Sequence, residues 1–109
     1  RVRLYGIDTP ESRTRDLDEK ARGKLAAKFL SDQILHADKL VIRTKLDKKG
    51  KFGRVLGTLI ADGVDLNQAM IDNYHAVGYT GQSKKLIQLQ HLANKEELLK
   101  LGKYEEVII

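Results

Sequence analysis

The segment of residues 4–13, LYGIDTPESR, limits more than any other what this chain of 109 residues can fold into. Its first residues have the apolar spacing of the end of a β-strand. Pro10 has a fixed φ and no backbone N–H, so a helix cannot run through the positions beside it. We therefore expect Asp8 and Glu11 to lie where a strand gives way to a loop.

Asp8, Thr9 and Glu11 are residues that can bind a metal and move a proton. Hard divalent cations prefer carboxylate and carbonyl oxygens, so Asp8 and the backbone carbonyl of Thr9 suit Ca²⁺ or Mg²⁺. Glu11 is then free to act as a base on a water molecule. The same residues also fit an ordinary strand-to-turn junction whose acids are only solvated, so the rest of the chain has to decide.

A second motif, Lys51-Phe52-Gly53-Arg54, lies where a basic hairpin tip meets its returning strand. The planar guanidinium of Arg54 can bind two phosphate oxygens at once, and the ring of Phe52 can stack on a base. On its own the motif favours an ordinary turn followed by a solvated arginine. Together with Arg3 and the acids near it, however, it completes the parts that a metal-assisted phosphodiesterase needs.

Charge and composition favour a polyanionic partner. The chain has 20 Lys and Arg against 15 Asp and Glu, a net charge of +5, which suits nucleic acid. It has no cysteine, which excludes disulfides and thiolate chemistry, and no apolar run approaches the roughly 20 residues of a membrane span. The compartment is unknown, because the sequence begins mid-strand at Arg1 and is expected to lack its natural N-terminus.

The hydrophobic pattern predicts an α+β fold in a single domain. Helical spacing covers residues 18–36, about 66–73, and a last helix that is capped by Ser83 and ends at Gly102. Asp65 resembles the cap of the second helix. Gly23, inside the first, is expected to allow close packing against a neighbour. The predicted strands are residues 1–7, 39–46 and 54–61, and residues 75–82 are expected to form a loop.

The remaining candidates carry less information. His36, His75 and His91 are scattered without a metal-binding spacing, and each is expected to be structural or exposed. Tyr79 fits either a base-stacking residue or a lid over the core.

Taken together, these motifs resemble the staphylococcal nuclease (thermonuclease-like) family. The resemblance reaches from residue 1 to about residue 102, in the family's order and spacing. It runs through Arg3-Leu4, Asp8-Thr9-Pro10-Glu11, the helix around Phe29, Lys51-Phe52-Gly53-Arg54, Ala61-Asp62-Gly63 and Leu66-Asn67.

The resemblance implies an OB-fold-like small antiparallel barrel with three helices, and Ca²⁺-dependent hydrolysis of DNA and RNA, preferably single-stranded or frayed. It makes Arg3 and Arg54 the catalytic phosphate-binding arginines and Glu11 the general base or water-orienting acid. It makes Asp8 a side-chain calcium ligand and Thr9 a ligand through its carbonyl.

The resemblance also assigns Lys51, Phe52 and Tyr79 to the substrate site. Tyr79 is one place away from the family's nucleotide-contacting tyrosine, where Thr80 stands in an ungapped match. The family's first two strands and a metal-binding aspartate between them are missing from residues 1–109. A monomer is expected if the barrel is complete. The alternative is a catalytically inactive module of the same fold that binds nucleic acid or protein.

Overall fold

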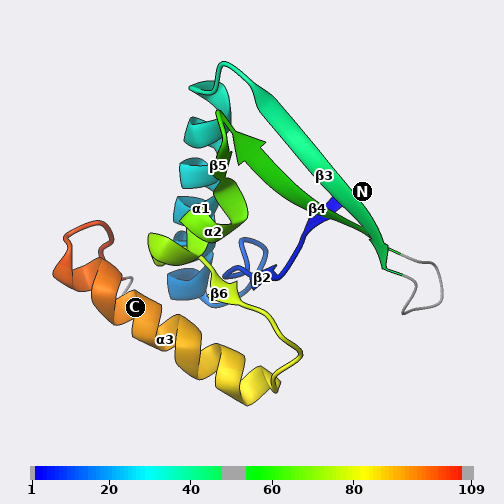
Figure 1. The fold of residues 1–109 in the computed structure, drawn as a ribbon. Coiled ribbons are helices and arrows are strands. Elements are labelled where there is room, and N and C mark those ends of the chain that lie inside the picture. Colours follow the sequence, from blue (N-terminus) through cyan, green and yellow to red (C-terminus); the bar gives the residue numbers. More distant parts are fainter. Residues whose placement is uncertain (1, 48–53, 107–109) are drawn as a thin grey trace.

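The computed structural model describes residues 2–47 and 54–106 (Figure 1). Strands and three helices are mixed along these ranges, in agreement with the expected α+β class. The elements are, in order, β1 (Val2–Leu4), β2 (Ile7–Asp8), α1 (Leu17–Leu35), β3 (Leu40–Asp47), β4 (Arg54–Ala61), β5 (Val64–Asp65), α2 (Leu66–Asp72), β6 (Val77–Gly78) and α3 (Lys84–Lys100).

The main sheet is built around β4. β3 and β4 form the predicted antiparallel hairpin, in register from Leu40 opposite Ala61 to Asp47 opposite Arg54. The other edge of β4 has two partners. β5 pairs antiparallel with the last residues of β4, and β1 pairs parallel with the first half of β4. β2 and β6 form a separate antiparallel ribbon.

This topology departs from a purely antiparallel barrel. The β1–β4 pair is parallel, and β2 leaves the main sheet to pair with β6. Closure into a barrel is not seen among residues 2–47 and 54–106, so both the closed barrel and the two missing strands stay predictions.

Two further expectations were wrong in detail. The strand predicted over residues 1–7 is interrupted at Gly6, whose φ of +75° turns the chain between β1 and β2. The loop predicted over residues 75–82 contains β6. β2 and β6 have two residues each, which is too short for a hydrophobic period, so only tertiary pairing defines them.

Side-chain caps begin the helices as the sequence indicates. The Asp65 carboxylate accepts the N–H of Gln68, and the Ser83 hydroxyl accepts that of Leu86, which confirms both predicted caps. At the start of α1, the Asp16 carboxylate accepts the N–H groups of Asp18 and Glu19. Because a cap supplies a partner for an otherwise unpaired N–H, it determines where a helix begins.

The core lies where α1 and α2 pack against the sheet and ribbon. Partly buried Leu4 and Leu30 contact both of its clusters and so join them. One cluster contains Ile7, Ala26, Met70 and Ala76, and the other contains Leu59, Ala61 and Leu66.

Asn67, at the start of α2, fastens this core to the strands. Its buried side-chain oxygen accepts the N–H of Leu59, and its amide nitrogen donates to the carbonyls of Tyr5 and Gly57. Three backbone groups from β4 and the turn after β1 are thereby satisfied by one side chain. The turn that leads from β1 into β2 is held in place as a result.

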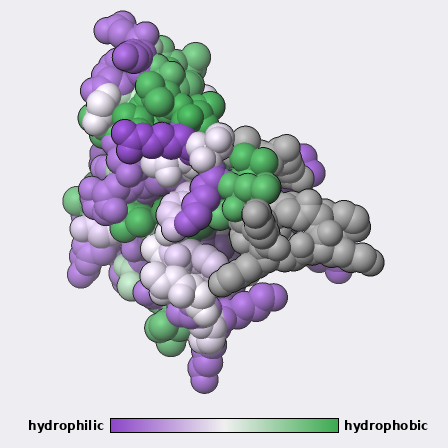
Figure 2. Space-filling view, turned by 45° about the vertical axis from the view of Figure 1, so that its right-hand side comes forward, coloured by the Kyte–Doolittle hydropathy of each residue, from purple (hydrophilic) through white to green (hydrophobic). Residues whose placement is uncertain are grey.

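Part of the sheet surface is apolar and exposed. Ile42, Leu46 and Val64 are each more than half exposed, and Figure 2 shows hydrophobic side chains gathered at the surface on the sheet side of the molecule. None of the helices in the described ranges combines the length and the apolarity needed to cross a membrane.

Burial of His75 should make the stability of this core depend on pH. It is buried against Phe29, with ring centroids 4.7 Å apart, and burial, followed by the charge of Lys103, lowers its pKa below the ordinary value of 6.5. As the pH falls below 6.5, the unfolded chain takes up this proton before the folded chain does, so the free energy of unfolding should fall. Replacing His75 with phenylalanine should flatten this part of the pH profile of the melting temperature. An unchanged slope in that variant would contradict the assignment.

Candidate functional site

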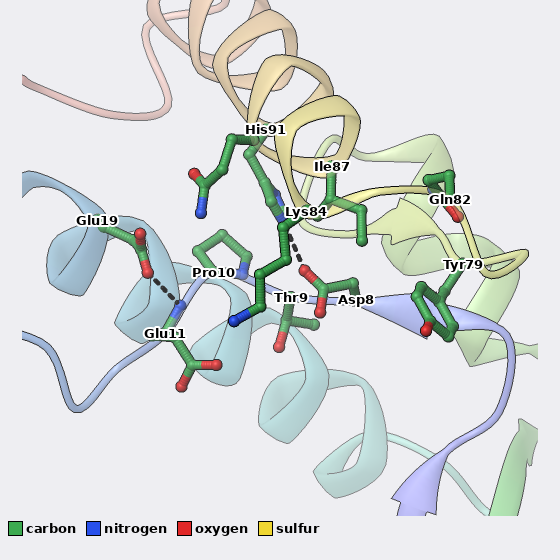
Figure 3. Close-up of a pocket in the computed structure, with 11 residues that line it drawn as sticks. Asp8, Thr9, Pro10, Glu11, Glu19, Tyr79, Gln82, Lys84, Ile87 and His91 are labelled. Carbon is green, nitrogen blue, oxygen red and sulfur yellow. Dashed lines mark hydrogen bonds and ion pairs between the residues drawn. The ribbon is translucent and has the colours of Figure 1, made fainter.

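The predicted acids lie on one short loop, which we call the acid loop (Asp8–Glu11). Asp8 is the last residue of β2 and pairs with Val77 of β6, and no regular structure follows it until α1. The expectation that the acids lie where a strand gives way to a loop is confirmed. Figure 3 shows the side chains of the acid loop between α1 and α3.

Helix α1 contacts the acid loop at Glu11. A carboxylate oxygen of Glu19 accepts the backbone N–H of Glu11 at 3.1 Å. Gly23 lies directly against the same backbone, since a Cβ added there would be 2.6 Å from the Glu11 carbonyl oxygen and 2.8 Å from the nitrogen of Ser12. The close packing expected at Gly23 is confirmed, and the backbone of Glu11 is what it packs against.

The acid loop forms one wall of a pocket of about 380 Å³. The other wall comes from the turn after β6 and from the first half of α3 (Figure 3). The pocket is thus lined by acids, a cation, amides and apolar groups together. The lining residues are Asp8, Thr9, Pro10, Glu11, Glu19, Tyr79, Gln82, Lys84, Ile87, Gln88 and His91.

A short polar contact across this pocket joins Asp8 to His91. The Nε2 atom of His91 is 2.7 Å from Oδ2 of Asp8, and the histidine side chain is only 7% exposed. The two residues are 83 positions apart. The expectation that His91 is merely structural or exposed missed this contact, because nothing in local spacing connects the two residues.

Helix α3 presents three polar side chains and Ile87 to the pocket. Lys84, Gln88 and His91 line it at a spacing of four and three residues, the spacing of one helical face. The leucines at 86, 89 and 92, which have helical spacing in the sequence, are about half exposed. This polar spacing is the signal that could have indicated the second wall of the pocket.

Polar contacts explain why this face of α3 turns inward. Asn94 donates to the carbonyl of Ala76, and Lys95 forms ion pairs with Asp18 of α1 and with Glu106. These two hydrogen-bonded carboxylates, Glu106 first, raise the pKa of the Lys95 ammonium. Since three separate segments hold α3, the position of its polar face is well determined.

Tyr79, but not Thr80, lines the pocket. The Tyr79 ring is 47% exposed and stands at its edge (Figure 3). Thr80 instead uses its N–H and hydroxyl to bind Gln82 within the turn. Of the two candidates for a nucleotide-contacting position, Tyr79 has the better placement, although a role in binding stays a prediction.

The two predicted arginines are on neighbouring strands. Arg3 of β1 is opposite Leu56 of β4, two residues after Arg54, and β1 leads through one turn into Asp8. The side chains of both arginines, together with all of Lys51 and Phe52, lie outside the described parts of the structure. Convergence of two guanidinium groups on the acid loop therefore stays a prediction.

The acid loop offers hard oxygen donors, but few of them. Asp8 keeps one carboxylate oxygen not bound to His91, and Thr9 next to it has a backbone carbonyl, so the donors fit Ca²⁺ or Mg²⁺ in kind. Across the described ranges, no group of three or more histidine, cysteine, aspartate or glutamate side chains is placed to hold a metal ion. A bound cation would complete its coordination with water or substrate oxygens, as hard cations commonly do.

Comparison with known proteins identifies the family. The model of the family described as staphylococcal nuclease homologue matches residues 1–102, almost the whole chain. This chain belongs to the staphylococcal nuclease homologue family. It is also 29% identical, over 76 residues, to an uncharacterized protein of Bacillus anthracis. That match covers 70% of this chain and 36% of the relative, so the chain spans about a third of the relative's length.

Membership of the staphylococcal nuclease homologue family confirms the resemblance found in the motifs. It makes this a domain of a nuclease family, and that family acts on nucleic acids and is generally Ca²⁺-dependent. The +5 charge of the chain is in keeping with such a partner.

Proposed function

We propose that this chain is a Ca²⁺-dependent nuclease that hydrolyses phosphodiester bonds of DNA and RNA, with single-stranded or frayed substrates preferred. The observation that carries the proposal is that Asp8, Thr9 and Glu11 line one pocket, on a loop that α1 and α3 hold from two sides.

Each residue has a separate task in this proposal. Glu11, which is exposed at the pocket, accepts a proton from the attacking water or orients it. Arg3 and Arg54 bind the phosphate and stabilise the extra negative charge of the transition state. Lys51, Phe52 and Tyr79 contact the nucleotide, with the two rings as stacking surfaces.

Asp8 and the carbonyl of Thr9 would hold the calcium ion. When bound, such a cation neutralises phosphate charge and polarises the bond to be broken. The protein's own contribution is to keep the Asp8 carboxylate in one orientation and to keep Glu11 within the same pocket.

A second candidate is a binding module without catalysis. The observation that favours it is that one Asp8 carboxylate oxygen is already bound to His91, which reduces the donors left for a metal. Such a module would bind oligonucleotides through its positive charge, with an affinity that does not depend on Ca²⁺ but falls with added salt.

An assay of the intact protein on end-labelled single-stranded DNA separates the two candidates. The nuclease should cleave in Ca²⁺ and stop when EDTA is added, because the cation is required for the reaction. The module should bind the DNA with the same affinity in Ca²⁺ and in EDTA and leave it uncut. Intact DNA under both conditions, measured on a denaturing gel alongside binding by fluorescence anisotropy, would contradict the nuclease.

A further inference from the structure

We infer that His91 of α3 is a positioning residue that holds Asp8 in the orientation needed to bind a cation. The inference rests on the proposed function, since it assigns a task to a residue next to the proposed calcium ligand. It adds to the site a helix that the acid-loop motif does not include.

The geometry of the contact indicates which atoms take part. An ionised carboxylate only accepts hydrogen bonds, so the Nε2 atom of His91 carries the hydrogen and donates it to Oδ2 of Asp8 at 2.7 Å. Asp8 is left with Oδ1, which lies on the pocket side together with Thr9 (Figure 3). One oxygen of Asp8 is therefore used for orientation and the other is left for a ligand.

The other ring nitrogen of His91 argues against a purely structural role. Nδ1 is buried and has no hydrogen-bond partner in the described parts of the chain. A buried polar atom without a partner costs free energy, and its presence calls for an explanation other than stability. An apolar side chain of similar size would fill this position in α3 without that cost.

The helix is held firmly enough for His91 to act in this way. Asn94, one turn further along α3, binds the carbonyl of Ala76 next to β6, and β6 pairs with β2, whose last residue is Asp8. Lys95 ties the same part of α3 to Asp18 of α1. Donor and acceptor thus belong to segments whose separation is determined by other contacts. Hydrogen bonds to ligating carboxylates from such rigid partners are known to tune metal affinity.

Two amide substitutions at His91 test the inference directly. A glutamine side chain places an N–H near the position of Nε2, whereas an asparagine is one carbon shorter and places it nearer Nδ1. We expect His91→Asn to weaken the binding of Ca²⁺, titrated alone into the intact protein by calorimetry, by about 10- to 100-fold. His91→Gln should bind Ca²⁺ nearly as well as the wild type. DNA cleavage should follow the same order.

Asn94→Ala is the matched control. It removes one anchor of α3, while Lys95 keeps its ion pair with Asp18 and His91 keeps its hydrogen bond to Asp8, so it should lower the melting temperature but weaken Ca²⁺ binding far less than His91→Asn does. Equal losses of affinity in His91→Asn, His91→Gln and Asn94→Ala would mean that the helix matters only as a whole, and would overturn the inference.

The outcomes also separate this inference from the proposed function. If the wild type binds Ca²⁺ and cleaves DNA while His91→Asn does both equally well, the inference is wrong and the nuclease stands. A wild-type protein that neither binds Ca²⁺ nor cleaves DNA would overturn both. If His91→Asn does not fold, His91→Gln decides, because weak Ca²⁺ binding by a folded His91→Gln would show that an N–H at the Nε2 position is not sufficient.

Discussion

Replacing Glu11 with glutamine should lower the rate of single-stranded DNA cleavage by about 100-fold or more, the lower end of what a general base contributes. Glutamine has nearly the same shape but cannot take up a proton at pH 7. The backbone N–H of Glu11, which Glu19 binds, is unaffected by the change. The rate constant under single-turnover conditions, with Ca²⁺ present, is the quantity to measure.

Glu19→Gln is the matched control for this experiment. It removes a negative charge from the same pocket, yet its amide oxygen can still accept the N–H of Glu11. Cleavage by Glu19→Gln should stay close to that of the wild type. If both variants lose activity to the same extent, the total charge of the pocket matters and Glu11 is not the base.

Replacing Gly23 with alanine should lower cleavage by about 100-fold, because it displaces a residue that the chemistry needs. A Cβ at this position would be 2.6 Å from the Glu11 carbonyl oxygen, about 0.8 Å short of the 3.4 Å at which ordinary contact begins. A displacement of about 1 Å in a catalytic group costs roughly that factor in rate. Alanine also favours a helix over glycine by about 1 kcal/mol, which offsets part of the strain.

We therefore expect Gly23→Ala to lose most of its cleavage activity while its melting temperature changes little. Lys24→Ala, the next position of α1 and exposed, introduces the same residue without a contact to the acid loop and should change neither quantity. A Gly23→Ala protein with a lower melting temperature but full activity would show that α1 moves and that the acid loop does not.

Much of the fold and of the site could be predicted from local sequence signals. Pro10 placed the acids after a strand, the side chains of Asp65 and Ser83 marked two helix starts, and the spacing of motifs from Arg3 to Asn67 indicated the family. These signals act through φ restriction, capping and local periodicity, which depend on residues only a few positions apart. They apply to a chain whatever it packs against.

The parts that could not be predicted depend on residues far apart in the chain. The β2–β6 ribbon and the three hydrogen bonds of Asn67 exist only once the segments have met. Which face of α3 turns inward also depends on such distant contacts. Its leucines have helical spacing, but ion pairs and hydrogen bonds to other segments decided the orientation.

By itself, then, the sequence determined the family, the class of fold, and the loop that carries Asp8 and Glu11. The loop and the helix starts could be predicted because φ restriction and capping depend only on residues close together in the chain. Only the tertiary structure decided that Gly23 supports Glu11 and that His91 binds Asp8. A pair of residues separated by 83 positions has no local signal, and its hydrogen bond forms only when packing brings both side chains to one pocket.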